Sequence, residues 1–248
     1  MESPPLIFGI HAVLEALSSE KQIEKILLKK GMEGRHLDHL LFLCRERHIP
    51  VQYVPIEKLD RTVTGRHQGV VAYIAHLEYI PLEAAVESAL STQPHPLVLL
   101  LDGVTDVRNL GAIARTAECA GVSLIVLPAK GGAAVNADAV KSSAGALLRI
   151  PVSRAPNLRM ALYYLKESGF SIVGTGEKGA TCIFDTDMCG PTAVVLGSED
   201  AGISASVWTL CDRHAFIPMQ GKISSLNVSA AAAAVLFEAV RQRTHRSH

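Results

Sequence analysis

The sequence predicts an α/β protein with a small N-terminal unit and a larger C-terminal unit built on a mostly parallel sheet. Segments with helical spacing alternate with strand-like segments along the whole chain. The run PLVLLLD at 96–102 is continuously apolar, as expected of a strand buried on both faces. Residues 79–96 carry a helical patch that ends in a polar, Pro-rich stretch, which is typical of a domain connection. With 248 residues, 48% of them hydrophobic, the chain can bury a core in each unit.

The N-terminal unit, residues 1–78, is expected to be a small α/β domain. Its apolar residues recur at helical spacing in two segments and at strand-like spacing in three others. In chain order we expect a helix in FGIHAVLEALS (8–18), a strand in IEKILLKK (23–30), a helix in GRHLDHLLFLCRERH (34–48), and strands in VQYVP (51–55) and GVVAYIA (69–75).

The C-terminal unit, residues 97–248, continues the alternation after its buried first strand. We expect a helix near 109–120, a strand in VSLIVLP (122–128), helices near 138–148 and in NLRMALYYLKESG (157–169), strands in FSIVGTG (170–176), AVVLGSE (193–199) and AFIPM (215–219), and a final helix after Asn227. Strands that alternate with helices imply a parallel sheet with covered faces. In such sheets, ligands bind at the carboxyl ends of the strands.

Charge alone does not identify a partner. The 24 Lys and Arg residues balance 24 Asp and Glu residues, and the isoelectric point lies near 7.1, so the chain lacks the overall basic field of many nucleic-acid-binding proteins. RNA is not excluded, because basic clusters remain at 35–48, 61–69 and 241–248. On charge alone, each cluster is equally well explained as a solvated helix face, a loop or a terminus.

Apolar runs and cysteines exclude several other classes. The longest apolar stretches fall well short of the ~20 residues needed to cross a bilayer, and the N-terminus lacks a charged-then-apolar signal pattern, so we expect a cytoplasmic protein. The five cysteines are scattered and none forms a C-x-x-C pair. The sequence therefore predicts neither a disulfide framework nor a metal site.

The first polar turn of interest is DGVTDVRNLGAIARTAECAG (102–121), which follows the buried strand at 97–101. Asp106 and Asn109 suit a helix start, where their side chains satisfy unpaired backbone N–H groups. Gly111 would let this helix approach its neighbours closely. Capping does not explain Arg115, which lies between small residues and costs desolvation unless it meets an anion or a carboxylate.

The second turn, VVLGSEDAGIS (194–204), follows a strand of β-branched residues. Gly197 permits positive φ or a backbone that passes close to a bound molecule. Glu199 has two readings of equal weight: a carboxylate that stabilises the first turn of the next helix, or a functional group.

The third turn, IPMQGKISSLNVS (217–229), runs directly into an alanine-rich helix. One Ser or Asn would suffice as the helix cap, yet the chain supplies Ser224, Ser225, Asn227 and Ser229 together, with Gly221 upstream. This surplus of polar groups indicates that the helix start also faces a ligand.

The stretch GTGEKG (174–179) matches G-x-G-x-x-G but not its structural context. A dinucleotide site needs the motif to open a helix whose N-terminus holds the pyrophosphate. The residues that follow, ATCIFDTDMCGP, are β-branched and turn-like. We therefore do not expect a Rossmann dinucleotide site.

Taken together, DGVTDVRNLGAIARTA, VVLGSEDAGIS and IPMQGKISSLNVSAAAA resemble, in this order and spacing, the three motifs of the SpoU/TrmH family of RNA ribose 2′-O-methyltransferases, of the SPOUT class. The segments FGIHAVLEAL and HQGVVAYI resemble the L30e-like substrate-binding domain found in members that methylate guanosine in 23S rRNA. The resemblance covers nearly the whole chain. It implies a C-terminal SPOUT-type sheet with a deep trefoil knot, S-adenosyl-L-methionine bound in that knot, and a homodimer.

The resemblance also assigns roles to individual residues. The positions that match catalytic or substrate-positioning positions of the family are Asn109, Arg115, Glu199, Ser225 and Asn227. Those that match the cofactor site, where the adenine is held mainly by backbone groups, are Gly197, Ile217, Met219 and Leu226. Family accounts sometimes make the arginine the base, whereas a guanidinium pKa above ~12 favours phosphate binding or oxyanion stabilisation. The sequence leaves this choice open.

The implied activity is transfer of a methyl group to a guanosine ribose in 23S rRNA. For RNA contact we select Arg61, Arg66 and His67, because a Gly-bearing basic loop can approach phosphates. Two alternatives remain: the same chemistry on tRNA or another rRNA nucleotide, and a non-catalytic RNA-binding factor in ribosome assembly. The N-terminal domain argues against tRNA, since relatives that act on the tRNA D-loop usually lack it. The intact motifs argue against a non-catalytic role.

Overall fold

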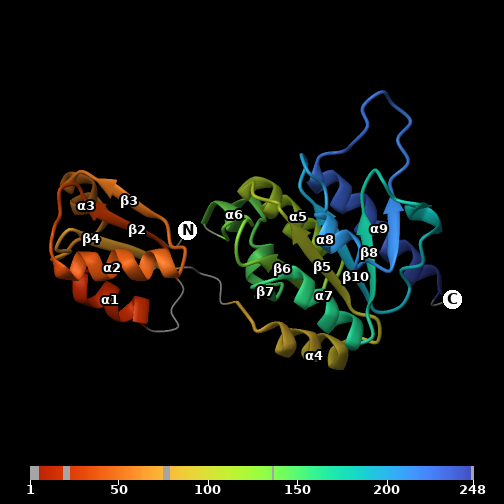
Figure 1. Ribbon diagram of the computed structural model, residues 1–248, viewed down its shortest axis with the longest axis horizontal. Helices are drawn as coiled ribbons and strands as arrows, with labels where there is room; N and C mark the ends of the chain where they lie inside the picture. The colour runs from red at the N-terminus through yellow and green to blue at the C-terminus, as the bar shows by residue number, and fades with distance from the viewer. Residues whose placement is uncertain (1–5, 19–22, 75–78, 136, 247–248) are drawn as a thin grey trace. The chain divides into compact units, whose positions relative to one another are not determined.

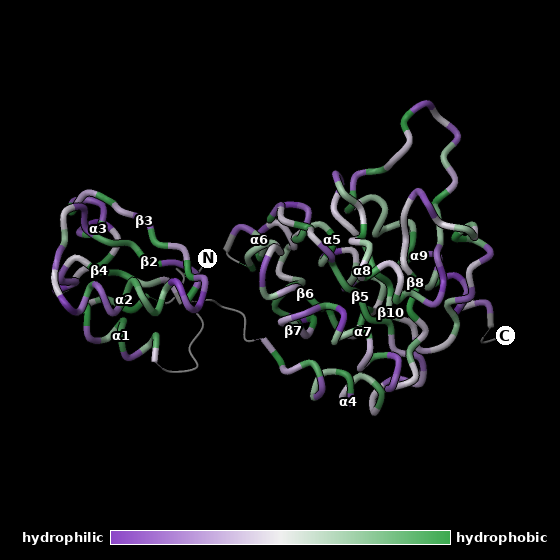
Figure 2. The backbone as a smooth tube through the Cα atoms, viewed as in Figure 1, coloured by the Kyte–Doolittle hydropathy of each residue, from purple (hydrophilic) through white to green (hydrophobic). Residues whose placement is uncertain are grey.

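The computed structural model describes residues 6–18, 23–74, 79–135 and 137–246 (Figure 1). The chain divides into two compact units, essentially residues 1–78 and 79–248. In both units the apolar residues lie along the strands and the inner helix faces (Figure 2). Each unit is described below by itself.

The N-terminal unit is a four-stranded mixed sheet with helices on both faces. Its elements are β1 (Leu6–Phe8), α1 (Ile10–Ser18), β2 (Ile23–Lys29), α2 (Arg35–Glu46), β3 (Val51–Val54), α3 (Ile56–Thr62) and β4 (Val70–Ile74). The strand order is β1-β4-β2-β3, in which β2 and β3 are parallel and the other pairs antiparallel.

Alternation along β2 explains how this sheet carries two cores. Ile26 and Leu28 point into the core shared with α1 and α2, while Leu27 points into the core shared with α3. The helices and strands expected in 8–75 are all present. Two short elements, β1 and α3, were not expected from the sequence.

The C-terminal unit contains the seven-stranded sheet. Its elements are α4 (Leu82–Thr92), β5 (Leu97–Asp102), α5 (Val107–Cys119), β6 (Leu124–Pro128), α6 (Ala137–Ser142), a 3-10 turn (Ala146–Leu148), β7 (Val152–Ala155), α7 (Leu158–Glu167), β8 (Ser171–Thr175), β9 (Thr181–Cys182), a second 3-10 turn (Ile183–Asp185), β10 (Thr192–Gly197), α8 (Ala205–Trp208), β11 (Arg213–Phe216) and α9 (Val228–Arg246).

The sheet of this unit has the order β7-β6-β5-β10-β8-β11-β9, and all of its described strand pairs are parallel. The prediction of a parallel sheet is therefore confirmed. The central strand β5 is buried at Leu97 through Leu101, as its continuous apolar run predicted. The short elements β7, β9 and α8 were not expected from the sequence.

Residues 79–96 were predicted to be a connection between domains, but most of them form helix α4, which packs in the core of the C-terminal unit. Helix α4 contacts β6, β7 and α7, and its Ala85 and Val86 are buried in the same core as Leu124 and Leu162. The small residues of α4 allow this close approach, and they gave only a weak apolar pattern in the sequence. The helix belongs to the C-terminal unit.

The structure agrees with two expectations about glycines, one for Gly111 and one for the GTGEKG stretch. A Cβ at Gly111 would collide with the Ser142 side chain and lie 2.9 Å from the Ala139 carbonyl oxygen, so α5 does approach α6 closely. The GTGEKG stretch is followed by β9 and not by a helix, which confirms that it lacks the context of a dinucleotide site.

The cysteines are all free, and Cys44 and Cys211 are buried. Burial raises the pKa of Cys44 to about 11 and that of Cys211 to about 12, so both thiols stay protonated near neutral pH. Among the described residues, no helix is long and apolar enough to cross a membrane.

The C-terminal half of α9 is anchored by Arg243. Its guanidinium donates to the backbone carbonyls of His95, Met188 and Gly190 at 2.9–3.0 Å. Burial lowers the pKa of this guanidinium, yet the three acceptors hold it in place. This contact fixes the helix whose other end carries Asn227.

We expect Arg243→Ala to lower the free energy of unfolding by about 2–4 kcal/mol, because the carbonyls lose their donor. Urea denaturation measures this change. Arg149→Ala is the matched control: its side chain is 74% exposed and lies 3.5 Å from Glu118, so its loss should cost less than about 1 kcal/mol. Equal destabilisation by the two variants would contradict the anchor.

Candidate functional site

The site is built where two neighbouring parallel strands end. Strands β5 and β10 lie side by side, and their last residues, Asp102 and Gly197, are partners in the register. The first and second polar turns therefore leave the sheet at the same edge. The Asp102 carboxylate also accepts a hydrogen bond from the Ser204 backbone N–H at 2.8 Å, which ties the two turns together.

Asp106 caps helix α5. Its carboxylate accepts hydrogen bonds from the backbone N–H groups of Arg108 at 2.7 Å and Asn109 at 2.9 Å. Because Asp106 performs the capping, the side chain of Asn109 is left for another contact. Its Nδ2 donates to Oε1 of Glu199 at 2.9 Å, which links the first turn to the second.

Asn227 joins the third turn to the other two. Its Nδ2 donates to Oδ1 of Asn109 at 3.1 Å and to Oε1 of Glu199. Its Oδ1 accepts from the Ser229 backbone N–H at 3.0 Å, so the same side chain caps helix α9. Asn109, Glu199 and Asn227 thus form one hydrogen-bonded cluster, called here the Asn-Glu-Asn cluster.

Glu199 lies at the centre of this cluster. Its Oε1 accepts from both asparagine amides, and the Val228 backbone N–H lies 3.4 Å away at the start of α9. A carboxylate at a helix N-terminus is stabilised by the helix dipole. The sequence had offered two roles of equal weight, stabilisation of the helix that directly follows Glu199 or a functional role, and the structure instead places the carboxylate at the start of α9, not at α8. The structure shows that Glu199 also organises two side chains from distant turns.

Arg115 and Ser225 are not part of the cluster. Arg115 is exposed on α5, six residues beyond Asn109, and Ser225 is exposed in the segment 217–227 between β11 and α9. That segment projects away from the sheet (Figure 1). Among the described residues, neither side chain makes a hydrogen bond or ion pair with the Asn-Glu-Asn cluster. Their roles in catalysis stay predictions.

The four residues expected at the cofactor site are spread along the same edge. Gly197 ends β10, while Ile217 and Met219 follow β11 and are half-buried. Strand β8 separates β10 from β11 in the sheet. Leu226 is 40% exposed, near the end of the projecting segment. Among the described residues, no hydrogen bond links any two of these four.

Gly197 has a structural reason to be glycine that the sequence did not show. A Cβ at this position would overlap the backbone of Gly202 and Ile203, because the turn closes on itself through the bridge between Ser198 and Gly202. The tight approach is therefore of backbone to backbone. Gly221 differs, since a Cβ there would meet nothing within 4 Å.

We expect Gly197→Ala to lower the free energy of unfolding by at least about 2 kcal/mol, because backbone cannot yield as a flexible side chain can. Gly221→Ala is the matched control and should leave thermal stability unchanged. Differential scanning calorimetry of both variants measures this. Unchanged stability of the Gly197 variant would show that the turn can open at no cost.

The RNA contacts expected in 61–69 divide into two exposed arginines and a buried histidine. Arg61 and Arg66 are exposed, as a phosphate contact requires. His67 is only 7% exposed. Its Nδ1 accepts from the Gly69 backbone N–H at 3.0 Å, so its Nε2 carries the proton and donates to Asp60 at 2.8 Å. Both ring nitrogens hold the loop together, which gives His67 a structural role, and its RNA contact stays a prediction.

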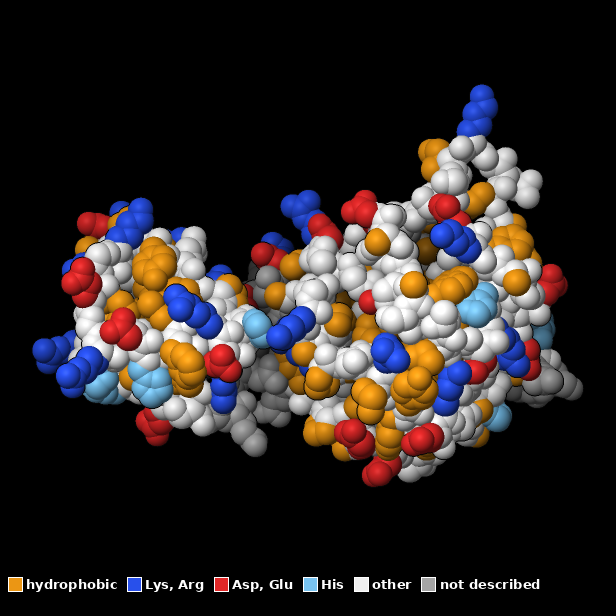
Figure 3. All heavy atoms as spheres, in the orientation of Figure 1, with side chains coloured by type: hydrophobic (Ala, Val, Ile, Leu, Met, Phe, Trp, Pro, Cys, Tyr) orange, Lys and Arg blue, Asp and Glu red, His pale blue; other side chains and the backbone are white. Residues whose placement is uncertain are grey.

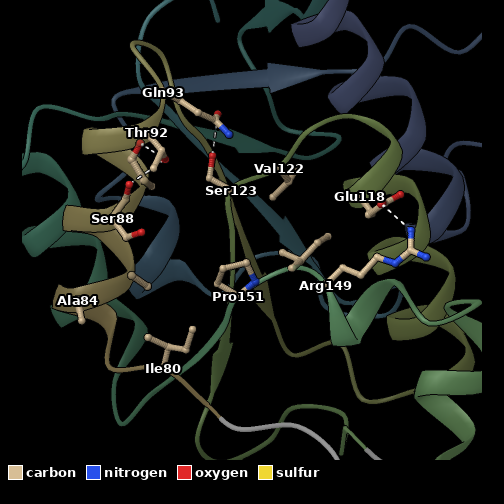
Figure 4. A pocket seen from close by; sticks show the side chains of 13 residues that line it. Ile80, Ala84, Ser88, Thr92, Gln93, Glu118, Val122, Ser123, Arg149 and Pro151 are labelled. Atoms are coloured by element: carbon tan, nitrogen blue, oxygen red, sulfur yellow. Dashed lines mark hydrogen bonds and ion pairs between the residues drawn. The ribbon is translucent and has the colours of Figure 1, made fainter.

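A cavity of about 440 Å³ lies elsewhere in this unit (Figure 4). It is lined by α4, the end of α5 and the residues that precede β6 and β7, including Ser88, Gln93, Ser123 and Arg149. The Ser123 hydroxyl donates to Gln93 at 3.0 Å across it. It lies at the amino ends of the strands, and of the three polar turns only Glu118, near the far end of the first, lines it. The Asn-Glu-Asn cluster, at the carboxyl ends, is the stronger candidate site.

Residues 96–237, which contain all three polar turns, match the SpoU rRNA Methylase family. The chain belongs to this family. Residues 6–80 match a second family, described as RNA 2′-O ribose methyltransferase substrate binding. Together the two matches cover both units of the structure.

Relatives of this SpoU family member resemble it over nearly its whole length. A protein of Staphylococcus saprophyticus assigned to the TrmH family of tRNA/rRNA methyltransferases is 38% identical, with 97% of this chain and 96% of that protein covered. YacO of Bacillus subtilis, with the same assignment, is 37% identical, with 96% and 95% covered.

Solved structures of methyltransferases share the fold. The SpoU methyltransferase AviRb from Streptomyces viridochromogenes, in complex with S-adenosylmethionine, gives a TM-score of 0.62 at 28% identity, with 97% of this chain and 90% of that chain covered. An S-adenosylmethionine-bound rRNA methyltransferase from Sinorhizobium meliloti gives 0.60 at 26% identity, with 95% and 86% covered. This SpoU member is an RNA methyltransferase that uses S-adenosylmethionine.

Two further contacts that shape this site were not expected from the sequence. Asp102 holds the turn that carries Glu199, and the Ser229 backbone N–H holds Asn227. Asp102 gave a signal in the sequence, as a carboxylate directly after a buried strand. Among the described residues, no group of His, Cys, Asp and Glu side chains is arranged to hold a metal ion.

Proposed function

We propose that the protein is an RlmB-type enzyme that methylates the ribose 2′-hydroxyl of a guanosine in 23S rRNA. The observation that carries this proposal is the Asn-Glu-Asn cluster, in which three motif turns from one sheet edge join through hydrogen bonds. The match of residues 6–80 to an RNA substrate-binding family supports a large structured RNA as the substrate.

The segment between β11 and α9 fits a cofactor held by main-chain groups. Within the described part of the chain, the backbone N–H and C=O groups of residues 218–226 make no hydrogen bond. Ile217, Met219 and Leu226 add apolar surface at either end of this stretch. We assign the S-adenosylmethionine site to Gly197, Ile217, Met219 and Leu226. In this proposal, the segments that follow β10 and β11 form the knot of the family around the cofactor. When bound, this cofactor supplies an electrophilic methyl group.

The residues of the cluster position the ribose. Since Oε1 of Glu199 already accepts from the asparagines, its role is to fix the two amide groups at the sheet edge. The amides then orient the 2′-hydroxyl for in-line attack, and positioning of this kind can supply several kcal/mol of rate enhancement.

Arg115 and Ser225 complete the proposed site from outside the cluster. An exposed guanidinium on α5 suits the RNA phosphate or the oxyanion that develops on the ribose, because arginine stays protonated at neutral pH. Ser225 would approach the ribose when the segment 217–227 closes over the cofactor.

The active unit is proposed to be a homodimer. Helix α9 packs against α5 on one side, and its Phe237 is 48% exposed on the alanine-rich helix. A second copy of the chain would cover this surface. Light scattering at micromolar concentration should give twice the mass of one chain, and the mass of a single chain would overturn this part of the proposal.

A tRNA substrate is the second candidate. A TrmH/SpoU tRNA modifying enzyme of A. aeolicus gives a TM-score of 0.58 at 30% identity, with 67% of this chain and 84% of that chain covered. This match covers only two thirds of the chain, so it supports the shared methyltransferase chemistry more than it supports tRNA as the substrate.

The test is direct methylation of purified RNA. Two parallel reactions would each contain the protein and S-adenosylmethionine with a labelled methyl group. One would contain an unmodified 23S rRNA transcript, and the other an unmodified tRNA transcript. We expect label in 23S rRNA at one guanosine. The phosphodiester bond on the 3′ side of that guanosine should resist alkaline cleavage, because its ribose 2′-hydroxyl is methylated. Label in tRNA alone would establish the second candidate. Binding of S-adenosylmethionine without transfer to either RNA would overturn the proposed substrates, and no binding at all would support a non-catalytic role.

A further inference from the structure

Three segments of the N-terminal unit that are distant in the sequence meet at one end of its sheet. The register places the end of β1, the end of β2 and the start of β4 together, since Phe8 pairs with Val71 and Leu28 pairs with Val70. Helices α1 and α2 begin at this same end. We call it the loop end, formed by residues 8–11, 29–36 and 64–69.

Specific contacts hold the loop end together. The Ile10 backbone N–H donates to the Gln68 side chain at 3.2 Å, and the Lys29 backbone N–H donates to the Gly69 carbonyl at 2.9 Å. The rings of His11 and His36 meet edge to face, with centroids 4.8 Å apart. Together with the buried His67, these contacts make the loop end a fixed surface of the domain.

Phe8 is exposed at this end for a structural reason. Its ring is 37% exposed and lies against Gly65, where a Cβ would come within 2.8 Å of the ring. The glycine lets the loop backbone pack on the ring while leaving an aromatic surface open. An open aromatic surface can stack on a base.

The charge of the loop end contrasts with the neutral chain. Its three segments contain four Lys or Arg residues and one acidic residue, Glu33. The side chains of Lys29, Arg35 and Arg66 are exposed. On the face shown in Figure 3, many basic side chains have acidic side chains nearby.

From these observations we infer that the loop end is the RNA-contacting face of the domain, and that it takes an unpaired nucleotide of a structured RNA. Phe8 stacks on the base, and the basic side chains contact the neighbouring phosphates. Bases can stack on protein aromatic groups only where they are not paired in a helix, which distinguishes a loop or bulge from a uniform duplex. This inference rests on the proposed function, because it concerns the RNA that the enzyme methylates. The six residues that form the face are Phe8, His11, Lys29, Arg35, His36 and Arg66.

The test compares charge loss at the two ends of the same domain in the full chain. One variant carries Lys29→Gln, Arg35→Gln and Arg66→Gln. The control carries Arg45→Gln and Arg47→Gln at the far end of α2, which is about 18 Å long. Fluorescence anisotropy would measure binding of a labelled RNA hairpin with an unpaired loop, at several salt concentrations.

We expect the triple variant to bind the hairpin at least about tenfold more weakly and to flatten the salt dependence by about two units of slope, at roughly 0.7 per lost phosphate contact. The control should retain affinity. Phe8→Leu should weaken hairpin binding by about tenfold with no change in slope, and should leave binding of a fully paired RNA unchanged.

Calorimetric titration with S-adenosylmethionine separates this inference from the proposed function. If the unchanged protein does not bind the cofactor, the proposed function fails, whatever the RNA results. If it binds the cofactor but the control loses as much RNA affinity as the triple variant, the loop end is not the RNA face. Equal affinity for hairpin and duplex, with no effect of Phe8→Leu on hairpin binding, would overturn the inference that the loop end binds an unpaired nucleotide. Circular dichroism would confirm that each variant is folded.

Discussion

Glu199→Ala is expected to lower the rate of methyl transfer by at least about 100-fold while leaving the fold intact. The side chain is exposed, so its loss uncovers no core, yet both asparagine amides lose their shared acceptor. A misplacement of about 1 Å at a reacting group can cost 100-fold in rate. Transfer to rRNA under single-turnover conditions, with saturating cofactor, measures this effect.

Asp200→Ala is the matched control, since Asp200 is the adjacent exposed carboxylate and should retain full activity. Asn109→Ala should resemble Glu199→Ala, because it removes a bond to both other members of the cluster. Arg115→Ala should also nearly abolish transfer, with the added signature of weaker RNA binding. Full activity in both Glu199→Ala and Asn109→Ala would remove the cluster from the mechanism.

Removing the N-terminal unit is expected to abolish rRNA methylation without loss of the cofactor site. In the proposed function, the N-terminal unit binds the RNA and the C-terminal unit binds the cofactor. The three motif turns lie wholly within the C-terminal unit. The position of the cut decides the outcome. A cut at residue 95, the far end of the connection predicted from the sequence, would remove α4.

Residues 79–248 should therefore fold and bind S-adenosylmethionine, whereas residues 95–248 should be strongly destabilised. Without α4, the core loses Ala85, Val86 and Ala89, and burial of one valine side chain alone contributes about 1.5–3 kcal/mol. Thermal unfolding and cofactor titration of the two fragments would measure the difference.

Full rRNA methylation by residues 79–248 would give the N-terminal domain another purpose and remove the main support for the 23S rRNA substrate. Equal stability of the two fragments would show that α4 is dispensable to the core.

Much of the secondary structure could be predicted because it depends on local pattern. The apolar run of β5, the helical spacing of α2 and α7, and the cap at Asp106 are each read from a few neighbouring residues. Short elements such as β1, with three residues, and β9, with two, carry too little periodicity to be recognised. Helix α4 was seen as a helical patch, but its small buried residues did not indicate which unit it joins.

Individual site residues were harder to place than elements. His67 and Arg66 are neighbours in one basic loop, and the sequence could not tell that one points inward to Asp60 while the other stays exposed. Gly197 was expected to leave room for a ligand, whereas its first requirement comes from the backbone of its own turn. Both differences arise from contacts across a loop, which spacing alone does not encode.

The sequence by itself determined the α/β class, the order of most elements and the polar turns that carry the chemistry. Tertiary structure decided which of those turns meet. Asn109 and Asn227 are 118 residues apart, yet their side chains lie 3.1 Å from each other. They meet because β10, from late in the chain, pairs directly with β5, and because α9 packs against α5. Strand order and helix packing are set by burial of the whole core, so no local segment contains the information that assembles the site.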